Sequence, residues 1–121
     1  MSTTYHEPTT ELSPQTREVH RALASLIEEL EAVDWYNQRV DVTSDPGLKA
    51  ILAHNRDEEI EHAAMALEWL RRCLPQFDQT LKTYLFTDKP ITELEASGGE
   101  PAAGTAPTAR GLGIGSLRKG G

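Results

Sequence analysis

The sequence lacks three features that would place it outside the cytoplasm or within a membrane. Cys73 is its only cysteine, so no intrachain disulfide can form and a reducing compartment is the simpler expectation. It has no apolar run long enough to span a bilayer. Residues 1–14 contain neither the basic nor the apolar region of a secretory signal. We therefore expect a soluble, cytoplasmic protein.

Basic residues are in the minority. Lysine and arginine number 12 against 19 acidic residues, which gives a formal charge of −7. The acidic residues are concentrated in the segments that we expect to be helical. This balance argues against nucleic acid and anionic membranes as partners, and it is compatible with cations.

The chain is too short for a large core. Its 121 residues allow one domain at most. We expect residues 1–12 to be a flexible N-terminus and residues 13–96 to form a helical domain. Residues 97–110, rich in Gly, Ala, Pro and Thr, read as a flexible linker, and residues 111–121 as a tail with three aliphatic side chains.

The apolar periodicity predicts two long helices and one short one. Ser13 and Pro14 are typical of a helix start, and helical spacing continues to about Val40. A turn at residues 44–47 leads into a second helix from Pro46 to Cys73. A third helix carries apolar residues from Phe77 onward, and residues 91–96 form one more turn. The predicted fold is all-α: an antiparallel two-helix hairpin plus a short C-terminal helix.

Two long helices cannot enclose a core by themselves. The apolar side of such a hairpin would face solvent in a monomer. Two hairpins packed face to face would complete a ferritin-like four-helix bundle, so the sequence predicts at least a dimer.

The most informative motif is Glu59-x-x-His62 in the second helix. A helical wheel places both residues on the apolar face. That face comprises Leu48, Ile51, Leu52, Asn55, Glu59, His62, Ala66, Trp69, Leu70 and Cys73. Burying a carboxylate and an imidazole there is costly unless a partner such as a metal ion binds them.

Glu29 is the carboxylate of the first helix that is best placed to meet this motif, because it lies at the edge of the apolar stripe. In di-iron four-helix bundles, two helices each supply a Glu and the other two each supply Glu-x-x-His. A two-fold axis would double Glu29, Glu59 and His62 into four carboxylates and two imidazoles, a set that suits two iron ions. The alternative is a solvated acidic turn beside an ordinary core histidine.

Three further groups each have two interpretations. The spacing of His54, Glu58 and Glu61 suits either a metal site or an exposed acidic face. Glu28 and Glu31 lie opposite the core side, where they either line an approach path for Fe²⁺ or are simple surface charge. Tyr36 either lies near the metals or fills the core. These residues are therefore weaker candidates than Glu29, Glu59 and His62.

Several segments closely resemble the encapsulated ferritins. They are residues 28–36 (EELEAVDWY), 54–65 (HNRDEEIEHAAM), 67–69 (LEW) and 83–87 (TYLFT). Residues 112–117 (LGIGSL) are similar to the peptide that docks such proteins inside an encapsulin nanocompartment.

The resemblance implies a ring-shaped decamer of hairpins with a di-iron ferroxidase centre between two subunits, loaded with Fe²⁺ and releasing Fe³⁺ for mineralisation and storage in the shell. Glu29, Glu59 and His62 would be the ligands, and Tyr36 would lie beside them. Glu28 and Glu31 would belong to the iron approach route, and His54, Glu58 and Glu61 to a peripheral metal site. Leu112, Ile114 and Leu117 would bind the encapsulin shell.

Two other functions are compatible with the same sequence. One is a non-enzymatic acidic helical adaptor that binds cations weakly and a partner through its tail. The other is a different di-metal carboxylate protein, such as a di-manganese or oxygenase-type enzyme. An adaptor gives no reason to place Glu59 and His62 on an apolar face, and a chain this short leaves little room for a substrate pocket.

Overall fold

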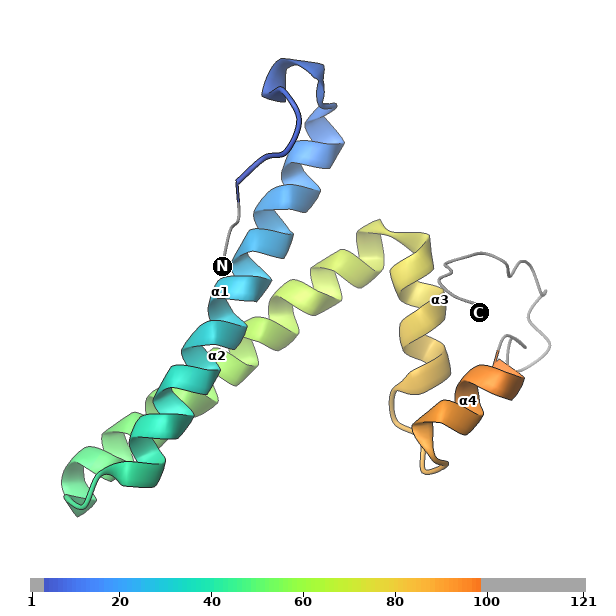
Figure 1. Cartoon of the computed structure of the whole chain (residues 1–121). Coiled ribbons are helices and arrows are strands. Elements are labelled where there is room, and N and C mark those ends of the chain that lie inside the picture. The colour runs from blue at the N-terminus through green and yellow to red at the C-terminus, as the bar shows by residue number, and fades with distance from the viewer. Residues whose placement is uncertain (1–3, 99–121) are drawn as a thin grey trace. The chain divides into compact units, whose positions relative to one another are not determined.

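The computed structural model describes residues 4–98, and all the regular structure in that range is helical (Figure 1). This confirms the predicted all-α fold. The elements are a 3-10 turn η1 (Thr9–Glu11), α1 (Pro14–Val42), α2 (Pro46–Cys73), α3 (Pro75–Tyr84) and α4 (Ile91–Gly98). Residues 99–121, which include most of the expected linker and the tail, lie outside the described residues.

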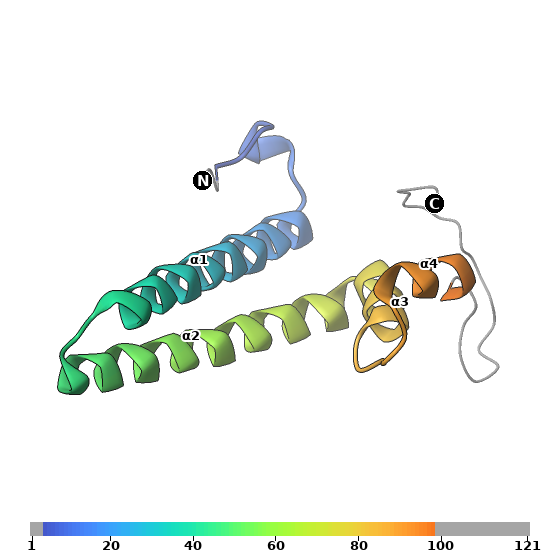
Figure 2. The ribbon, with the colours of Figure 1, turned by 60° about the horizontal axis from the view of Figure 1, so that its bottom comes forward.

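The chain divides into two compact units at Cys73 and Leu74. In the first unit α1 and α2 run antiparallel and side by side (Figures 1 and 2). Only residues 43–45 connect them. The predicted hairpin is therefore present, and each arm is about 40 Å long at about 1.5 Å per residue.

Side-chain caps define where the two long helices begin. The Ser13 hydroxyl accepts a hydrogen bond from the Thr16 amide at 3.0 Å, and Pro14 follows as the first helical residue. At the start of α2, the Asp45 carboxylate accepts one from the Leu48 amide at 2.7 Å. Both predicted starts are confirmed. The first helix ends at Val42, slightly beyond the predicted end near Val40.

Side chains of α1 contact the segment that precedes it, and the flexibility predicted for residues 1–12 stays a prediction. An Arg17 guanidinium nitrogen donates hydrogen bonds to the carbonyls of Leu12 at 2.6 Å and Thr9 at 3.0 Å. The ring of Tyr5 stacks on that of His20 with centroids 4.1 Å apart. These contacts join residues several positions apart, so amino-acid composition does not predict them.

The second unit contains α3 and α4, which contact each other. Pro75 begins α3, and the Pro90 carbonyl accepts hydrogen bonds from the amides of Glu93 and Leu94 in the first turn of α4. The turn between them holds Phe86 at a φ of 59°, with its side chain exposed. The second helix of this pair extends to Gly98, beyond the predicted end at residue 96.

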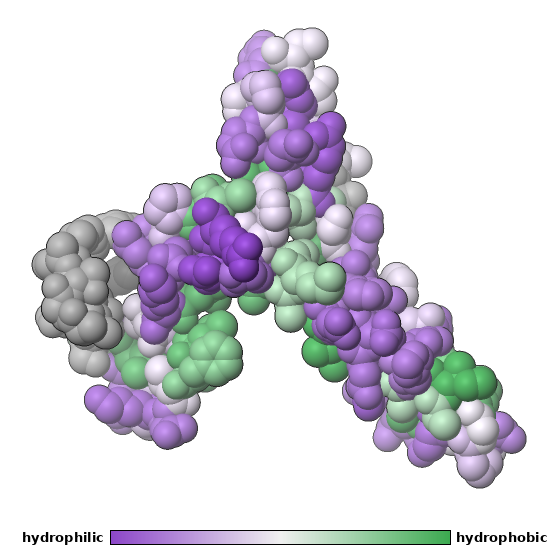
Figure 3. All heavy atoms as spheres, turned by 180° about the vertical axis from the view of Figure 1, so that it is seen from behind, coloured by the Kyte–Doolittle hydropathy of each residue, from purple (hydrophilic) through white to green (hydrophobic). Residues whose placement is uncertain are grey.

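Few side chains are buried in a single copy of the chain. Among the described residues, only Ala63, Leu70 and Leu94 are classed as buried. Large apolar side chains are exposed along the hairpin, and Figure 3 shows hydrophobic surface on this part of the molecule. These residues are Leu23, Leu30, Trp35, Val42, Leu48, Ile51, Ile60, Met65 and Trp69. The hairpin thus has an apolar surface that it cannot cover by itself.

None of the helices within residues 4–98 combines the length and the apolar character that crossing a membrane requires.

Candidate metal centre

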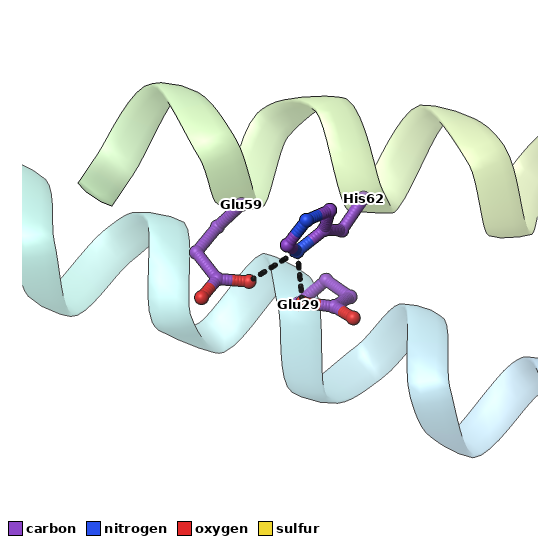
Figure 4. Close-up of side chains that lie close together, drawn as sticks. All are labelled: Glu29, Glu59 and His62. Carbon is purple, nitrogen blue, oxygen red and sulfur yellow. Dashed lines mark hydrogen bonds and ion pairs between the residues drawn. The ribbon is translucent and has the colours of Figure 1, made fainter. Parts of the chain in front are cut away.

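Three side chains from the middle of the hairpin converge between its two helices (Figure 4). Glu29 comes from α1, and Glu59 and His62 come from α2. Glu59 and His62 are three positions apart, so they project one above the other from the same side of α2. The side chains of Glu29 and Glu59 are 28% and 24% exposed, and that of His62 is 45% exposed. The cluster is therefore sheltered on one side and open on the other.

The His62 ring directs Nδ1 toward both carboxylates. This nitrogen lies 3.4 Å from Glu59 Oε1 and 3.8 Å from Glu29 Oε1. One donor atom from each of the three residues lies within 4.8 Å of the other two. Two donors on opposite sides of one ion are about 4.2 Å apart at typical metal–ligand distances. Small side-chain rotations would therefore fit this set to a cation.

The two carboxyl groups interact with each other as well as with the imidazole. A hydrogen bond with Glu59, together with partial burial, raises the pKa of Glu29. The same hydrogen bond lowers the pKa of Glu59, and His62 adds to that effect. The two carboxyl groups therefore shift each other's pKa in opposite directions, as expected of two acids held close together. A divalent cation between the two carboxylates would relieve their mutual repulsion.

Glu58 contacts the opposite edge of the His62 ring. Its Oε1 lies 3.9 Å from His62 Nε2, and its Oε2 lies 3.8 Å from His54 Nε2. The sequence analysis grouped Glu58 with His54 and Glu61 and missed its contact with His62. The i, i+4 spacing of Glu58 and His62 was the available signal.

The other candidates do not join the central cluster. Tyr36 is half-buried, and the guanidinium of Arg39 lies over its ring at 5.3 Å from the centroid. Glu28 and Glu61 are exposed, whereas Glu31 is half-buried although it was placed opposite the core side. Over residues 4–98, the only group of three or more potential ligands within metal-binding distance is Glu29, Glu59 and His62.

A helical hairpin with one glutamate on its first helix and Glu-x-x-His on its second is half of the arrangement found in ferritin-like bundles. The sequence model of the EncFtn-like family matches residues 4–88, and the chain belongs to that family. The resemblance to encapsulated ferritins is thereby confirmed.

Three known proteins are similar to most of the chain. The encapsulated ferritin-like protein of Rhodospirillum rubrum is 56% identical over 125 residues, covering 97% of this chain and 89% of the relative. The encapsulin nanocompartment cargo protein EncC of Myxococcus xanthus is 36% identical over 113 residues, covering 84% and 86%. A Nitrosomonas europaea protein of known crystal structure is 71% identical with a TM-score of 0.70, covering 72% of this chain and 96% of that one.

The geometry makes a direct prediction about metal binding. His62→Ala should lower the affinity for Co²⁺ by at least about tenfold, because loss of a ligand costs no less than loss of an outer partner. The visible absorption of bound Co²⁺ measures this. Glu18→Ala, on α1 but outside the cluster, is the matched control. Equal Co²⁺ affinity of the His62 variant and the unaltered protein would exclude His62 as a ligand.

Proposed function

We propose that this protein is a ferroxidase that oxidises Fe²⁺ to Fe³⁺ with O₂ at a di-iron centre shared by two subunits. The observation that carries the proposal is the convergence of Glu29, Glu59 and His62 between α1 and α2. Carboxylates and neutral imidazole are suitable ligands for iron, and the order in which the helices supply them is that of di-iron bundles.

A second hairpin would complete the centre. One hairpin supplies two carboxylates and one imidazole, which is too few for two iron ions. A two-fold axis beside the cluster supplies the missing half and covers the apolar side chains that a single hairpin exposes, such as Leu30, Ile51 and Met65. In line with the family resemblance, we propose that such dimers assemble into a decameric ring.

The ligands of this chain favour the oxidised form of the substrate. Two Fe²⁺ ions give one electron each to one O₂, which takes up two protons to form hydrogen peroxide, and both ions leave as Fe³⁺. Four carboxylates in a dimer place negative charge around the metals, and anionic oxygen stabilises the higher charge of the ferric ion. His62 would supply a nitrogen donor, which completes the ligand set without adding a further negative charge.

We assign supporting roles to the other candidate residues. Glu28 is exposed one residue before Glu29, and with Glu31 it would attract Fe²⁺ toward the centre. Tyr36 would lie beside the centre in the assembled protein. His54 and Glu61 would capture cations at the outer face of α2, where both are exposed.

The proposed location is the interior of an encapsulin shell. Two relatives bear names that describe an encapsulated protein and an encapsulin cargo. The tail carries Leu112, Ile114 and Leu117 after a linker rich in Gly, Ala, Pro and Thr, a composition that does not form a core. Short apolar anchors bind weakly one at a time, and many tails on one ring would bind by avidity.

Oxidation of Fe²⁺ tests the proposed activity. Anaerobic protein loaded with Fe²⁺ and then exposed to air should develop ferric absorbance much faster than buffer. Glu59→Ala and His62→Ala should each lower the initial rate by at least about tenfold, because symmetry doubles every lost ligand.

Glu18→Ala controls for the loss of a surface carboxylate from the hairpin. The ferroxidase proposal fails if the protein oxidises Fe²⁺ no faster than buffer, and the site assignment fails if both ligand variants match the unaltered rate. Parallel trials with Mn²⁺ distinguish a di-manganese protein.

Metal should promote association of the hairpins. In a dimer four carboxylates repel one another, and bridging cations remove that repulsion, so metal stabilises the assembly by mass action. Light scattering after size exclusion should show a higher average mass with Fe²⁺ under anaerobic conditions than with chelator. A protein that stays monomeric in saturating Fe²⁺ would contradict a centre shared by two subunits.

Loss of the tail should separate activity from location. Deleting residues 111–121 should leave Fe²⁺ oxidation unchanged and abolish loading into encapsulin, because the tail contributes no proposed ligand. Co-expression with an encapsulin, followed by shell purification and quantification of cargo, measures loading. Truncated protein recovered in shells at the full-length level would exclude this role for the tail.

A further inference from the structure

The two nitrogens of the His62 ring face different acidic partners. Nδ1 faces Glu59 at 3.4 Å and Glu29 at 3.8 Å, on the side of the proposed metal centre. Nε2 faces Glu58 at 3.9 Å, on the other edge of the ring. Glu58 and Glu59 are neighbours in the sequence, yet they lie on opposite edges of one imidazole. Neighbouring carboxylates of α2 therefore lie near both nitrogens of this histidine.

A neutral imidazole can bind a metal through only one nitrogen at a time, and the other nitrogen carries the proton. Which nitrogen is free depends on what accepts the hydrogen bond of the other. Metal-binding histidines usually donate that N–H group to a carboxylate or a carbonyl, which orients the ring and makes it a better ligand. His62 needs such an acceptor at Nε2 if Nδ1 is to bind iron.

We propose that Glu58 is the positioning residue that accepts the Nε2–H of His62 and so presents Nδ1 to the metal centre. The proposal rests on the proposed metal centre and adds a residue that acts through His62 without touching iron. Over the described residues, Glu58 is the only acidic partner recorded at Nε2. The distance of 3.9 Å exceeds a hydrogen bond, so the proposal requires that rotation of the two partly exposed side chains shortens it when the ring binds metal.

His54 restrains Glu58 from the other side. Glu58 uses Oε1 toward His62 and Oε2 toward His54, which is 3.8 Å away and one turn earlier on α2. The carboxylate thus lies between two imidazoles at i−4 and i+4. In the proposal, attraction to His54 at one oxygen favours the side-chain orientation that keeps the other oxygen toward His62.

This role differs from a peripheral cation site formed by His54, Glu58 and Glu61. In such a site the three residues would be equivalent, and their replacement would leave His62 unaffected. Glu61 is exposed, and no contact between it and His62 is recorded among the described residues. Replacing Glu58 and Glu61 separately therefore distinguishes the two roles.

The test measures the tautomer of His62 directly. Metal-free full-length protein labelled with ¹⁵N-histidine is studied by solid-state NMR at about pH 8, where an ordinary imidazole is neutral. The His62 signal is assigned by its loss in His62→Ala. We expect a dominant Nε2–H tautomer in the unaltered protein and a mixture of both tautomers in Glu58→Ala.

Two further variants complete the design. Glu58→Gln keeps a carbonyl oxygen that accepts the Nε2–H, so it should preserve the tautomer although the charge is lost. Glu61→Ala should also preserve it. Zn²⁺, which is redox-inert, should bind the centre about 10–100-fold more weakly in Glu58→Ala than in Glu58→Gln.

The proposal is overturned if Glu58→Ala keeps a dominant Nε2–H tautomer or if Glu61→Ala changes the tautomer as much as Glu58→Ala does. Equal Zn²⁺ affinity of Glu58→Ala and Glu58→Gln would also overturn it. These readouts need no iron oxidation. A protein without ferroxidase activity whose His62 tautomer still depends on Glu58 would refute the proposed function and leave the positioning role intact.

Discussion

Glu29 and Glu59 face each other across the hairpin at a place where two packed helices ordinarily bring apolar side chains together. The hydrogen bond between them raises the pKa of Glu29 and lowers that of Glu59, so the two carboxyl groups are electrostatically coupled. A cation between them would relieve the repulsion of two carboxylates and would accept a donor atom from His62 as well. The metal proposal rests on this close approach of two acidic groups and one imidazole inside the hairpin.

The apolar surface and the polar cluster are incomplete in the same way. The hairpin exposes large side chains such as Ile51 and Met65, at 59% and 61%, and it also leaves His62 at 45% exposure beside its two carboxylates. A second hairpin would cover the exposed apolar side chains and would complete the ligand set around His62. Because one symmetric partner would do both, assembly and metal binding are coupled in the proposal.

The sequence predicted the features that depend on local patterns. Caps at Ser13 and Asp45 define the helix starts, and helical periodicity placed Glu59 and His62 on one face and Glu29 opposite them. Features set by side-chain direction were not predictable. The Arg17 contacts that hold the N-terminal segment depend on tertiary geometry. So does the choice between the two nitrogens of His62, because helical spacing brings residues together without fixing their rotamers.

The acidic run of α2 shows why position matters more than composition here. Glu58, Glu59 and Glu61 are the same residue type within four positions, and by charge alone they describe a solvated helix face. A rotation of about 100° per residue sends Glu59 toward α1 and leaves Glu58 on the outer edge of His62, with Glu61 exposed. In our proposal the imidazole between them makes Glu59 a ligand and Glu58 the support of a ligand. The arrangement needs no irregular backbone in α2, because the helical rotation alone places the two carboxylates on different sides of one ring.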